Sequence, residues 1–258
     1  MWDAKQYDRF ADDRIRPFYD LVRRVGAERP HQVVDLGCGT GAATASLAQR
    51  WPHARVTGID NSTQMLDQAA QHELPGRLTF EQADLAKWTP AEPVDVLVSN
   101  AALQWVPGHR ELLPAFVSWL APGGWLAFQV PGNFRAPAHR LLTELRQSPR
   151  WRDLVGAGAD RHLVVAEPAE YLAELAGLGC LVDAWETTYL HVLPGEDAVL
   201  DWMKGTGLRP VLDALAEPQQ AEFLAEYGAL LREEFPRRPW GTVLEFRRIF
   251  VVAHLDRD

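Results

Sequence analysis

The chain has 258 residues, of which 47% are hydrophobic and 24% charged, and its formal net charge is -9 at pH 7. This composition is typical of a folded globular protein and excludes collagen-like, coiled-coil and disordered chains. The excess of acidic side chains repels phosphate backbones, so nucleic acid is not an expected partner. Two cysteines, Cys38 and Cys180, stand far apart and predict neither a disulfide framework nor a zinc site. No stretch approaches the roughly 18 apolar residues of a membrane span and the charged start lacks a signal peptide's apolar segment, so we expect a cytoplasmic protein without a membrane partner.

Residues 1–30 carry apolar side chains near helical spacing, Tyr7 and Phe10 among them, and predict an N-terminal helical cap with a kink at Pro17. From residue 31 on, short apolar segments alternate with helical patterns. This alternation predicts right-handed crossovers and a buried parallel sheet, with a ligand at the carboxyl ends of the first and fourth strands. The predicted strands are 32–36, 55–60, 78–82, 94–100 and 125–130, and the predicted helices between them are 42–51, 61–72 and 109–120.

After residue 131 the alternation of short apolar segments and helical patterns becomes less regular. Helices are predicted over 137–146 and 168–176, and an extended segment rich in β-branched and aromatic residues covers 181–192. A helical, amphipathic stretch then separates this segment from a last strand over 242–253. We therefore expect an α/β fold with a doubly wound, mostly parallel, seven-stranded Rossmann-like sheet. The expected organisation is one domain over 1–258, with a cap over 1–30, a core of 31–193 and 242–258, and a helical lid inserted at 194–241.

The segment Asp35-Leu36-Gly37-Cys38-Gly39-Thr40-Gly41 follows the first predicted strand. Its three alternate glycines allow a tight turn and let a ligand lie against the peptide plane. A dinucleotide loop usually has the spacing GxGxxG, whereas this loop has GxGxG, and the Asp35 carboxylate repels a pyrophosphate but attracts a cation. The loop therefore favours a nucleoside whose tail carries an ammonium and a sulfonium, which is S-adenosylmethionine. A plain structural turn and a dinucleotide site are the alternatives.

Acidic residues follow the next two predicted strands. Asp60 can accept hydrogen bonds from both ribose hydroxyls of a nucleoside, although it can equally cap the following helix. Asp84 can accept the exocyclic amine of an adenine flanked by Ala83 and Leu85, or it is a solvated turn residue. The candidate residues for the nucleoside are Asp35, Gly37, Gly39, Gly41, Asp60, Asn61, Asp84, Leu85 and Asn100.

Segments 35–41, 58–60, 83–85, 94–100 and 120–124 resemble, in order and spacing, the successive motifs of class I S-adenosylmethionine-dependent methyltransferases. Further similarity over segments 50–60, 99–107, 187–189, 201–202 and 206–210 extends over nearly the whole chain. It is to members that methylate a carboxylate of a small unsaturated tricarboxylic acid. The resemblance implies an enzyme that uses S-adenosylmethionine as co-substrate and takes a small tricarboxylate as substrate.

Methyl transfer from a sulfonium is an in-line displacement, and a carboxylate acceptor is already ionised at pH 7 because such groups titrate near a pH of about 4. Such an acceptor requires no general base, so we expect no catalytic acid or base and look instead for groups that align and desolvate the reactants. The eight histidines show no paired metal-ligand spacing, and no metal is expected.

A tricarboxylate bound to an acidic protein requires local cations and hydrogen-bond donors. Arg209 is the first candidate, because Gly207 and Pro210 place it at a bend rather than on a regular solvated helix face. Each candidate has a structural alternative, such as a surface arginine, a satisfied buried histidine or a packed aromatic ring. The other candidates for the acceptor site are Gln104, Trp105, Thr188, Tyr189, His191 and Trp202.

Three other functions stay open on the sequence. The first is a methyltransferase of the same fold that acts on another small acceptor. The second is an NAD-dependent oxidoreductase, which the GxGxG spacing and Asp35 disfavour. The third is a methyltransferase-like binding protein without turnover.

Overall fold

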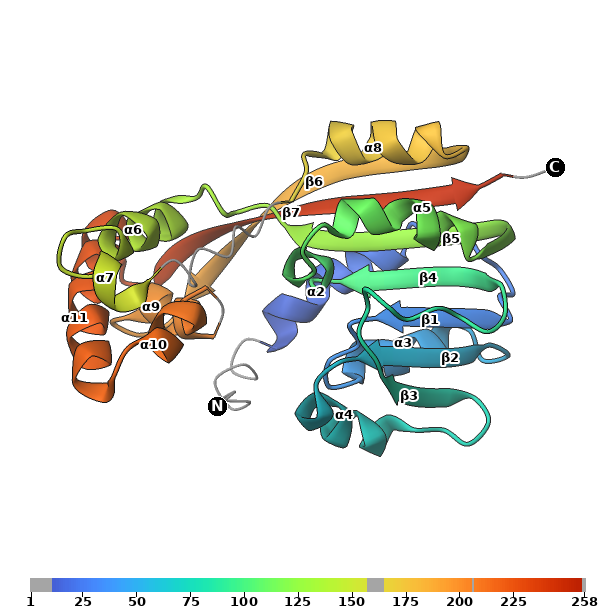
Figure 1. The fold of residues 1–258 in the computed structure, drawn as a ribbon, viewed down its shortest axis with the longest axis horizontal. Helices are drawn as coiled ribbons and strands as arrows, with labels where there is room; N and C mark the ends of the chain where they lie inside the picture. Colours follow the sequence, from blue (N-terminus) through green and yellow to red (C-terminus); the bar gives the residue numbers. More distant parts are fainter. Residues whose placement is uncertain (1–10, 157–164, 206, 257–258) are drawn as a thin grey trace. The chain divides into compact units, whose positions relative to one another are not determined.

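The computed structural model describes residues 11–156, 165–205 and 207–256 (Figure 1). Its centre is a seven-stranded sheet in the order β3-β2-β1-β4-β5-β7-β6. The predicted seven-stranded α/β fold is therefore confirmed. The strands are β1 (Gln32–Leu36), β2 (Arg55–Asp60), β3 (Leu78–Gln82), β4 (Val94–Asn100), β5 (Leu120–Pro131), β6 (Cys180–Leu193) and β7 (Thr242–Leu255).

The strand order reverses between β1 and β4. Strand β1 pairs in parallel with β2 on one side and with β4 on the other, whereas β5 pairs antiparallel with β7. Helices lie on both faces of the sheet (Figure 1), which explains why β1 and β4 are almost entirely buried and carry mostly apolar residues in their middle. In a sheet of this kind a ligand binds where the order reverses, beyond the carboxyl ends of the strands.

The helices follow the predicted segments closely. Ser62 caps α4 by accepting the Met65 N–H through its hydroxyl, as the sequence predicts for Asn61 or Ser62. Pro17 lies inside α2. The helices are α2 (Ala11–Val22), α3 (Ala42–Arg50), α4 (Thr63–Ala69), α5 (Leu113–Ser118), α6 (Pro137–Arg146), α7 (Arg152–Val155), α8 (Pro168–Gly177), α9 (Ala198–Lys204), α10 (Arg209–Ala214) and α11 (Glu217–Glu234), with 3-10 turns at Ala70–His72, Leu103–Trp105 and His109–Leu112.

The structure differs from the prediction around β5. This strand begins at Leu120 rather than at Trp125, because Leu120 already pairs with Val94 and the ladder to β4 then shifts register. The sequence Pro122-Gly123-Gly124 predicts the end of the preceding helix and a loop. In the structure these residues lie within β5, as an irregularity of the strand. The preceding helix ends at Ser118, and its first turn is a 3-10 helix. Tyr7 and Phe10 lie outside the described residues.

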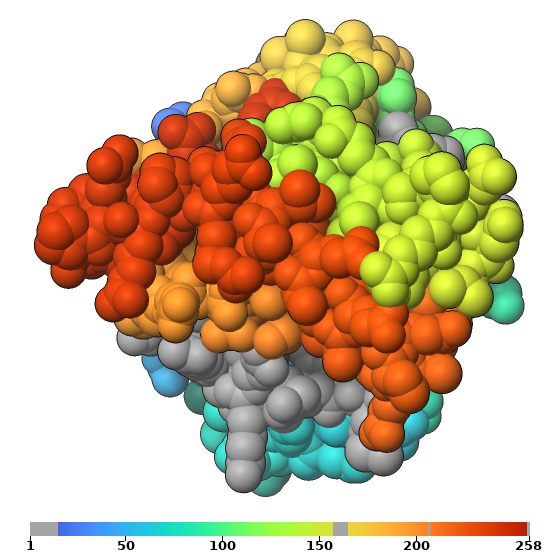
Figure 2. All heavy atoms as spheres, turned by 90° about the vertical axis from the view of Figure 1, so that its left-hand side faces the viewer, coloured from blue at the N-terminus to red at the C-terminus, as the bar shows by residue number. Residues whose placement is uncertain are grey.

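The fold divides into two compact units, each with its own apolar core. Among the described residues, the sheet unit comprises 14–131, 165–187 and 248–256, and the helical unit comprises 11–13, 132–156, 188–205 and 207–247. In the helical unit α6 and α11 pack side by side (Figure 2), and the Tyr227 hydroxyl donates to the Ala138 carbonyl at 2.8 Å. The assignment of 194–241 as a lid stays a prediction. Within the described part of the chain, every helix is too short or too polar to cross a bilayer.

Candidate active site

The turn after β1 depends on glycine. Gly37 and Gly41 have φ of 82° and 78°, in the left-handed region, and Gly41 begins α3. A Cβ added to Gly37 would lie 2.2 Å from the Ala102 Cβ, and one added to Gly41 would lie 2.7 Å from the Phe80 ring. Neither position accepts a side chain, so the turn after β1 packs directly against the loop after β4.

Asp35 lies beneath this turn, at the end of β1. Its side chain is buried, with 2% exposed, and its Oδ2 accepts a hydrogen bond of 2.7 Å from the Thr44 hydroxyl of α3. Burial, followed by the negative charge of Asp60, raises the pKa of Asp35 to about 6 despite the Thr44 hydrogen bond. The Asp35 carboxyl group therefore gains or loses its proton closer to neutral pH than an ordinary aspartate does.

Asp60, at the end of β2, uses both carboxylate oxygens. Its Oδ2 accepts the Gly39 N–H and its Oδ1 accepts the Ser62 N–H, each at 2.9 Å. The carboxylate thus ties the turn after β1 to the start of α4. Each oxygen has a further lone pair that can accept from a ligand. Asn61, which lies between Asp60 and Ser62 in the sequence, is exposed.

The loop after β3 holds Asp84 and Leu85. Asp84 Oδ1 accepts the Ala86 N–H at 3.0 Å, and its Oδ2 lies 3.5 Å from the Lys87 Nζ, with about half of the side chain exposed. These contacts fit the turn role that the sequence left open, and they leave the adenine role as a prediction. Leu85 is buried beside Gly37.

The loop after β4 is the most strained segment of this edge. Ala101 has a φ of 53°, the only positive value for a non-glycine residue in the described ranges. The Gln104 Nε2 donates to the Ala101 carbonyl at 2.6 Å, which leaves the buried Oε1 of Gln104 without a hydrogen-bond partner. The Oδ1 of Asn100 is also buried and unpartnered. Trp105 is 49% exposed.

The sheet unit therefore brings all nine nucleoside candidates to one edge, at the carboxyl ends of β1, β2, β3 and β4. Carboxylate and carbonyl oxygens dominate this edge. Asp35 and Asp60 form no ion pair with any residue of the described ranges, and two amide oxygens lack partners. Such a donor-poor, acceptor-rich edge suits a cationic nucleoside and disfavours a pyrophosphate. Gln104 and Trp105 lie on this edge too.

Three other candidates cluster in the helical unit. The His191 ring stacks on Trp202 with a centroid distance of 4.8 Å and lies 6.3 Å from the Tyr189 ring. His191 and Trp202 both contact the Phe246 ring. The Arg209 Nε lies 3.7 Å from the Asp213 carboxylate, one turn along α10. Arg209, where the sequence predicts a bend, is the first residue of α10. Thr188 is exposed on β6.

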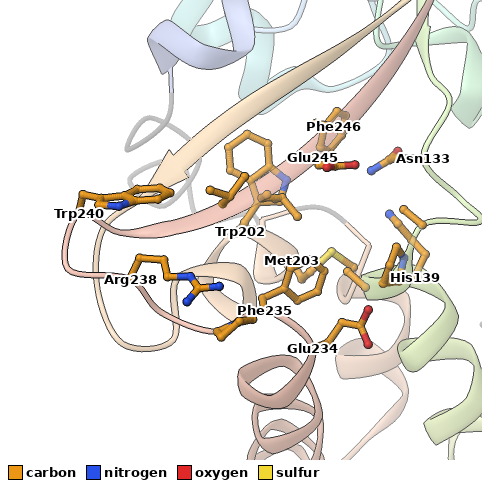
Figure 3. Close-up of a pocket in the computed structure, with 16 residues that line it drawn as sticks. Asn133, His139, Trp202, Met203, Glu234, Phe235, Arg238, Trp240, Glu245 and Phe246 are labelled. Carbon is orange, nitrogen blue, oxygen red and sulfur yellow. The ribbon is translucent and has the colours of Figure 1, made fainter.

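A pocket of about 580 Å³ opens beside this cluster (Figure 3). Its wall is mainly apolar and aromatic, with Trp202, Phe235 and Trp240 among its rings. Sequence reasoning missed its polar residues, because they come from separate segments and no local spacing connects them. These are Asn133, His139, Glu234, Arg238 and Glu245.

The pocket is less cationic than the sequence led us to expect. Burial lowers the pKa of His139 to about 4, so that imidazole is neutral at pH 7. Arg238 is the single guanidinium among the sixteen lining residues, and its side chain forms no ion pair with any described residue. Of the two carboxylates, Glu234 lies 3.8 Å from the Arg140 guanidinium and Glu245 is exposed.

Comparison with known proteins identifies the family. The model of the family described as "Methyltransferase domain" matches residues 33–124, which span the glycine turn and the loops after β2, β3 and β4. A trans-aconitate 2-methyltransferase of Streptomyces avermitilis is 55% identical over 98% of this chain and 96% of its own length. One from Rhodococcus jostii is 50% identical over 99% of this chain and its own full length. The chain belongs to the trans-aconitate 2-methyltransferase family.

Solved structures agree with the fold of this family. A protein of Bacillus halodurans described as a methyltransferase is 14% identical and superposes with a TM-score of 0.61, over 93% of this chain and 99% of that one. The N-methyltransferase NodS of Bradyrhizobium japonicum, solved with S-adenosylhomocysteine, is 16% identical with a TM-score of 0.52, over 93% of this chain and 86% of that one.

Membership of the trans-aconitate 2-methyltransferase family makes this chain an S-adenosylmethionine-dependent methyltransferase. Its co-substrate is S-adenosylmethionine, as the glycine turn and the resemblance predict. The observed edge fits that co-substrate, because the buried Asp35 carboxyl, the half-buried Asp60 carboxylate and two buried amide oxygens without a hydrogen-bond partner suit a sulfonium and an ammonium.

Proposed function

We propose that this chain transfers a methyl group from S-adenosylmethionine to one carboxylate of trans-aconitate or of a closely related small tricarboxylic acid. The observation that carries this proposal is the identity of 47% to 55% to relatives of that name over 98% or more of this chain. Identity of this extent includes the helical unit, from which acceptor residues come in this proposal, as well as the methyltransferase motifs.

The proposed reaction requires little acid–base chemistry from the protein. S-adenosylmethionine supplies a methyl group on a positively charged sulfur, and the acceptor carboxylate is already ionised at neutral pH. The chain's own contribution is to bind both molecules, hold them in line and exclude water. Orientation of this kind contributes roughly 7 to 11 kcal/mol to catalysis.

On the donor side, Asp60 accepts the ribose hydroxyls in this proposal, while Gly37, Gly39 and Gly41 allow close approach to the turn. Asp35 supplies negative charge for the cationic tail. The other donor-site assignments are Asn61, Asp84, Leu85 and Asn100, each at the same edge of the sheet.

On the acceptor side, we assign the pocket of the helical unit to the tricarboxylate. Its support is the Arg238 guanidinium, which forms no ion pair with a described residue and lies beside aromatic walls that include Trp202. A guanidinium binds a carboxylate through two parallel hydrogen bonds. Arg209 is a weaker assignment than the sequence indicated, since Asp213 already partners it. Gln104, Trp105, Tyr189 and His191 remain proposed acceptor-site residues.

The test is a radiolabelled methyl-donor assay against a panel that contains trans-aconitate, its cis isomer, citrate, a dicarboxylate and a long-chain fatty acid. We expect methyl ester formation with trans-aconitate above all others. Transfer to the fatty acid alone would overturn the acceptor and leave the methyltransferase activity in place. Donor binding without transfer to any acid would favour a binding protein.

A further inference from the structure

Asp35 and Asp60 lie at the ends of neighbouring strands beneath the glycine turn. The charge of Asp60 raises the pKa of Asp35, and neither carboxylate forms an ion pair within the described residues, although Asp35 accepts a hydrogen bond from the Thr44 hydroxyl. A buried carboxylate beside a second carboxylate is stabilised either by a proton or by a nearby cation. A proton on Asp35 and a cation bound beside it therefore compete with each other.

Both oxygens of Asp60 accept backbone N–H groups, from Gly39 and Ser62. Among the described residues, Asp35 accepts a side-chain hydrogen bond only from the Thr44 hydroxyl, and it is almost fully buried. Its protonation consequently depends on the Thr44 hydrogen bond and on the charges that surround it.

Among the described residues around Asp35, no other side chain replaces the Thr44 hydroxyl as a hydrogen-bond donor to its carboxylate. Across from it lies Asp60 on β2, and Cys38 follows in the turn, with a thiol whose pKa is raised by burial and by both carboxylates. On β4, the Ser99 hydroxyl is engaged by the Leu36 carbonyl at 2.7 Å. Thr44 is itself fully buried in α3, so water does not compete for its hydroxyl.

We propose that Thr44 is a positioning residue for the methyl donor: its hydroxyl orients the Asp35 carboxylate and favours its ionised form, and binding of the cationic donor expels a proton from Asp35 to solvent. This inference rests on the proposed placement of the donor at the glycine turn. It does not depend on the identity of the acceptor. No bond other than the carboxyl O–H is broken, and the proton passes to the buffer.

The pair Thr44→Val and Thr44→Ser tests the proposal. Valine keeps the shape of threonine and removes the hydroxyl, whereas serine keeps the hydroxyl. Calorimetry of S-adenosylmethionine binding between about pH 5 and pH 8.5, in two buffers of different ionisation enthalpy, gives both the affinity and the number of protons released. Ser46→Ala is the matched control, because the Ser46 hydroxyl bonds to the Ala43 carbonyl in the same helix and not to Asp35.

For the wild-type protein we expect release of up to about half a proton per donor bound near pH 6, rising toward about one proton at lower pH, and an affinity that falls as the pH drops below about 6. In Thr44→Val the fall should begin at higher pH, so that affinity near pH 7 is about threefold to tenfold weaker and recovers toward the wild-type value near pH 8.5. Thr44→Ser should restore the wild-type profile. A residue needed only for packing would show the same deficit at every pH.

Two results would overturn the proposal: wild-type binding without proton release, or a Thr44→Val affinity that does not depend on pH differently from the wild type. If Thr44→Val does not fold, Asp35→Asn replaces it, and proton release should then disappear. Because no acceptor is present in these measurements, such a failure leaves the carboxyl methylation standing. Absence of any S-adenosylmethionine binding would instead contradict the placement of the donor.

Discussion

The Asp60 carboxylate accepts the Gly39 N–H and the Ser62 N–H at 2.9 Å each, one with each oxygen. These are hydrogen bonds to an ionised group, which are stronger than those between neutral groups. The conformation of the glycine turn after β1 therefore depends on a charge carried by the neighbouring strand. A single side chain contributes both to the shape of the turn and to the binding of the ribose that we assign to it.

Asp60→Asn should lower the affinity for S-adenosylmethionine about tenfold or more. An amide has one acceptor oxygen, so its NH₂ group would face one of the two backbone N–H donors. Calorimetry measures the dissociation constant, and Asp67→Asn, an exposed position on α4, is the control. Unchanged affinity in Asp60→Asn would contradict the assignment of Asp60 to the donor.

Asp35→Asn should stabilise the ligand-free protein while it weakens donor binding. The pKa of Asp35 is about 6 in the fold against an ordinary 3.8, so the folded protein keeps a proton that the unfolded chain has lost. This group's contribution to stability therefore declines as pH rises through that window and stays lost above it. The variant should gain about 2 to 3 kcal/mol near pH 7.5 and nothing near pH 4 in urea unfolding. A less stable variant near pH 7.5 would refute this reasoning.

His139 gives the opposite pH dependence. Burial lowers its pKa to about 4 from 6.5, so between these values the unfolded chain binds a proton that the folded protein does not. The stabilising contribution is complete above pH 6.5 and is lost as pH falls toward about 4. We expect His139→Gln to remove about 2 to 3 kcal/mol of this dependence in urea titrations at a series of pH values. Parallel profiles for both proteins would show that His139 is not the group concerned.

Arg238→Ala should raise the KM for trans-aconitate about tenfold or more and leave the donor dissociation constant unchanged. The reason is the loss of the single guanidinium that lines the pocket of the helical unit. Arg237→Ala removes an equal charge from the adjacent exposed position, which does not line the pocket, and serves as control. If both variants change KM equally, general electrostatic attraction and not the pocket explains the effect.

Gln104→Ala should reduce kcat by an order of magnitude or more, with a smaller effect on donor affinity. The Gln104 amide supports the left-handed Ala101 through its carbonyl, and its loss lets the loop after β4 relax. Initial rates and donor calorimetry separate the two effects. Turnover equal to that of the wild type would remove Gln104 from the acceptor site.

The strands of the sheet could be predicted because each of them has a recognisable local sequence pattern. Val94–Asn100, for example, has a β-branched and apolar centre and follows Pro93, and the structure gives that strand the same bounds. The glycine turn could also be located from the sequence, although its spacing left a plain turn and a dinucleotide site as alternatives. Arg209 shows the limit of such reasoning: the sequence predicts a bend there, whereas the structure places Arg209 at the start of α10 with Asp213 one turn later, and its role in the acceptor site stays a prediction. The pocket that holds Arg238 and His139 could not be predicted, because no periodicity connects a loop after α11 with the start of α6.

Contact between the positions of Gly37 and Ala102 has a consequence for protein engineering. Because a methyl group on residue 37 would collide with the methyl group of residue 102, neither turn can be transplanted alone into another scaffold. A graft must carry both turns together with the spacing of the two strands that bear them. Across diverging sequences, substitutions at these two sites should accordingly arise as a linked pair.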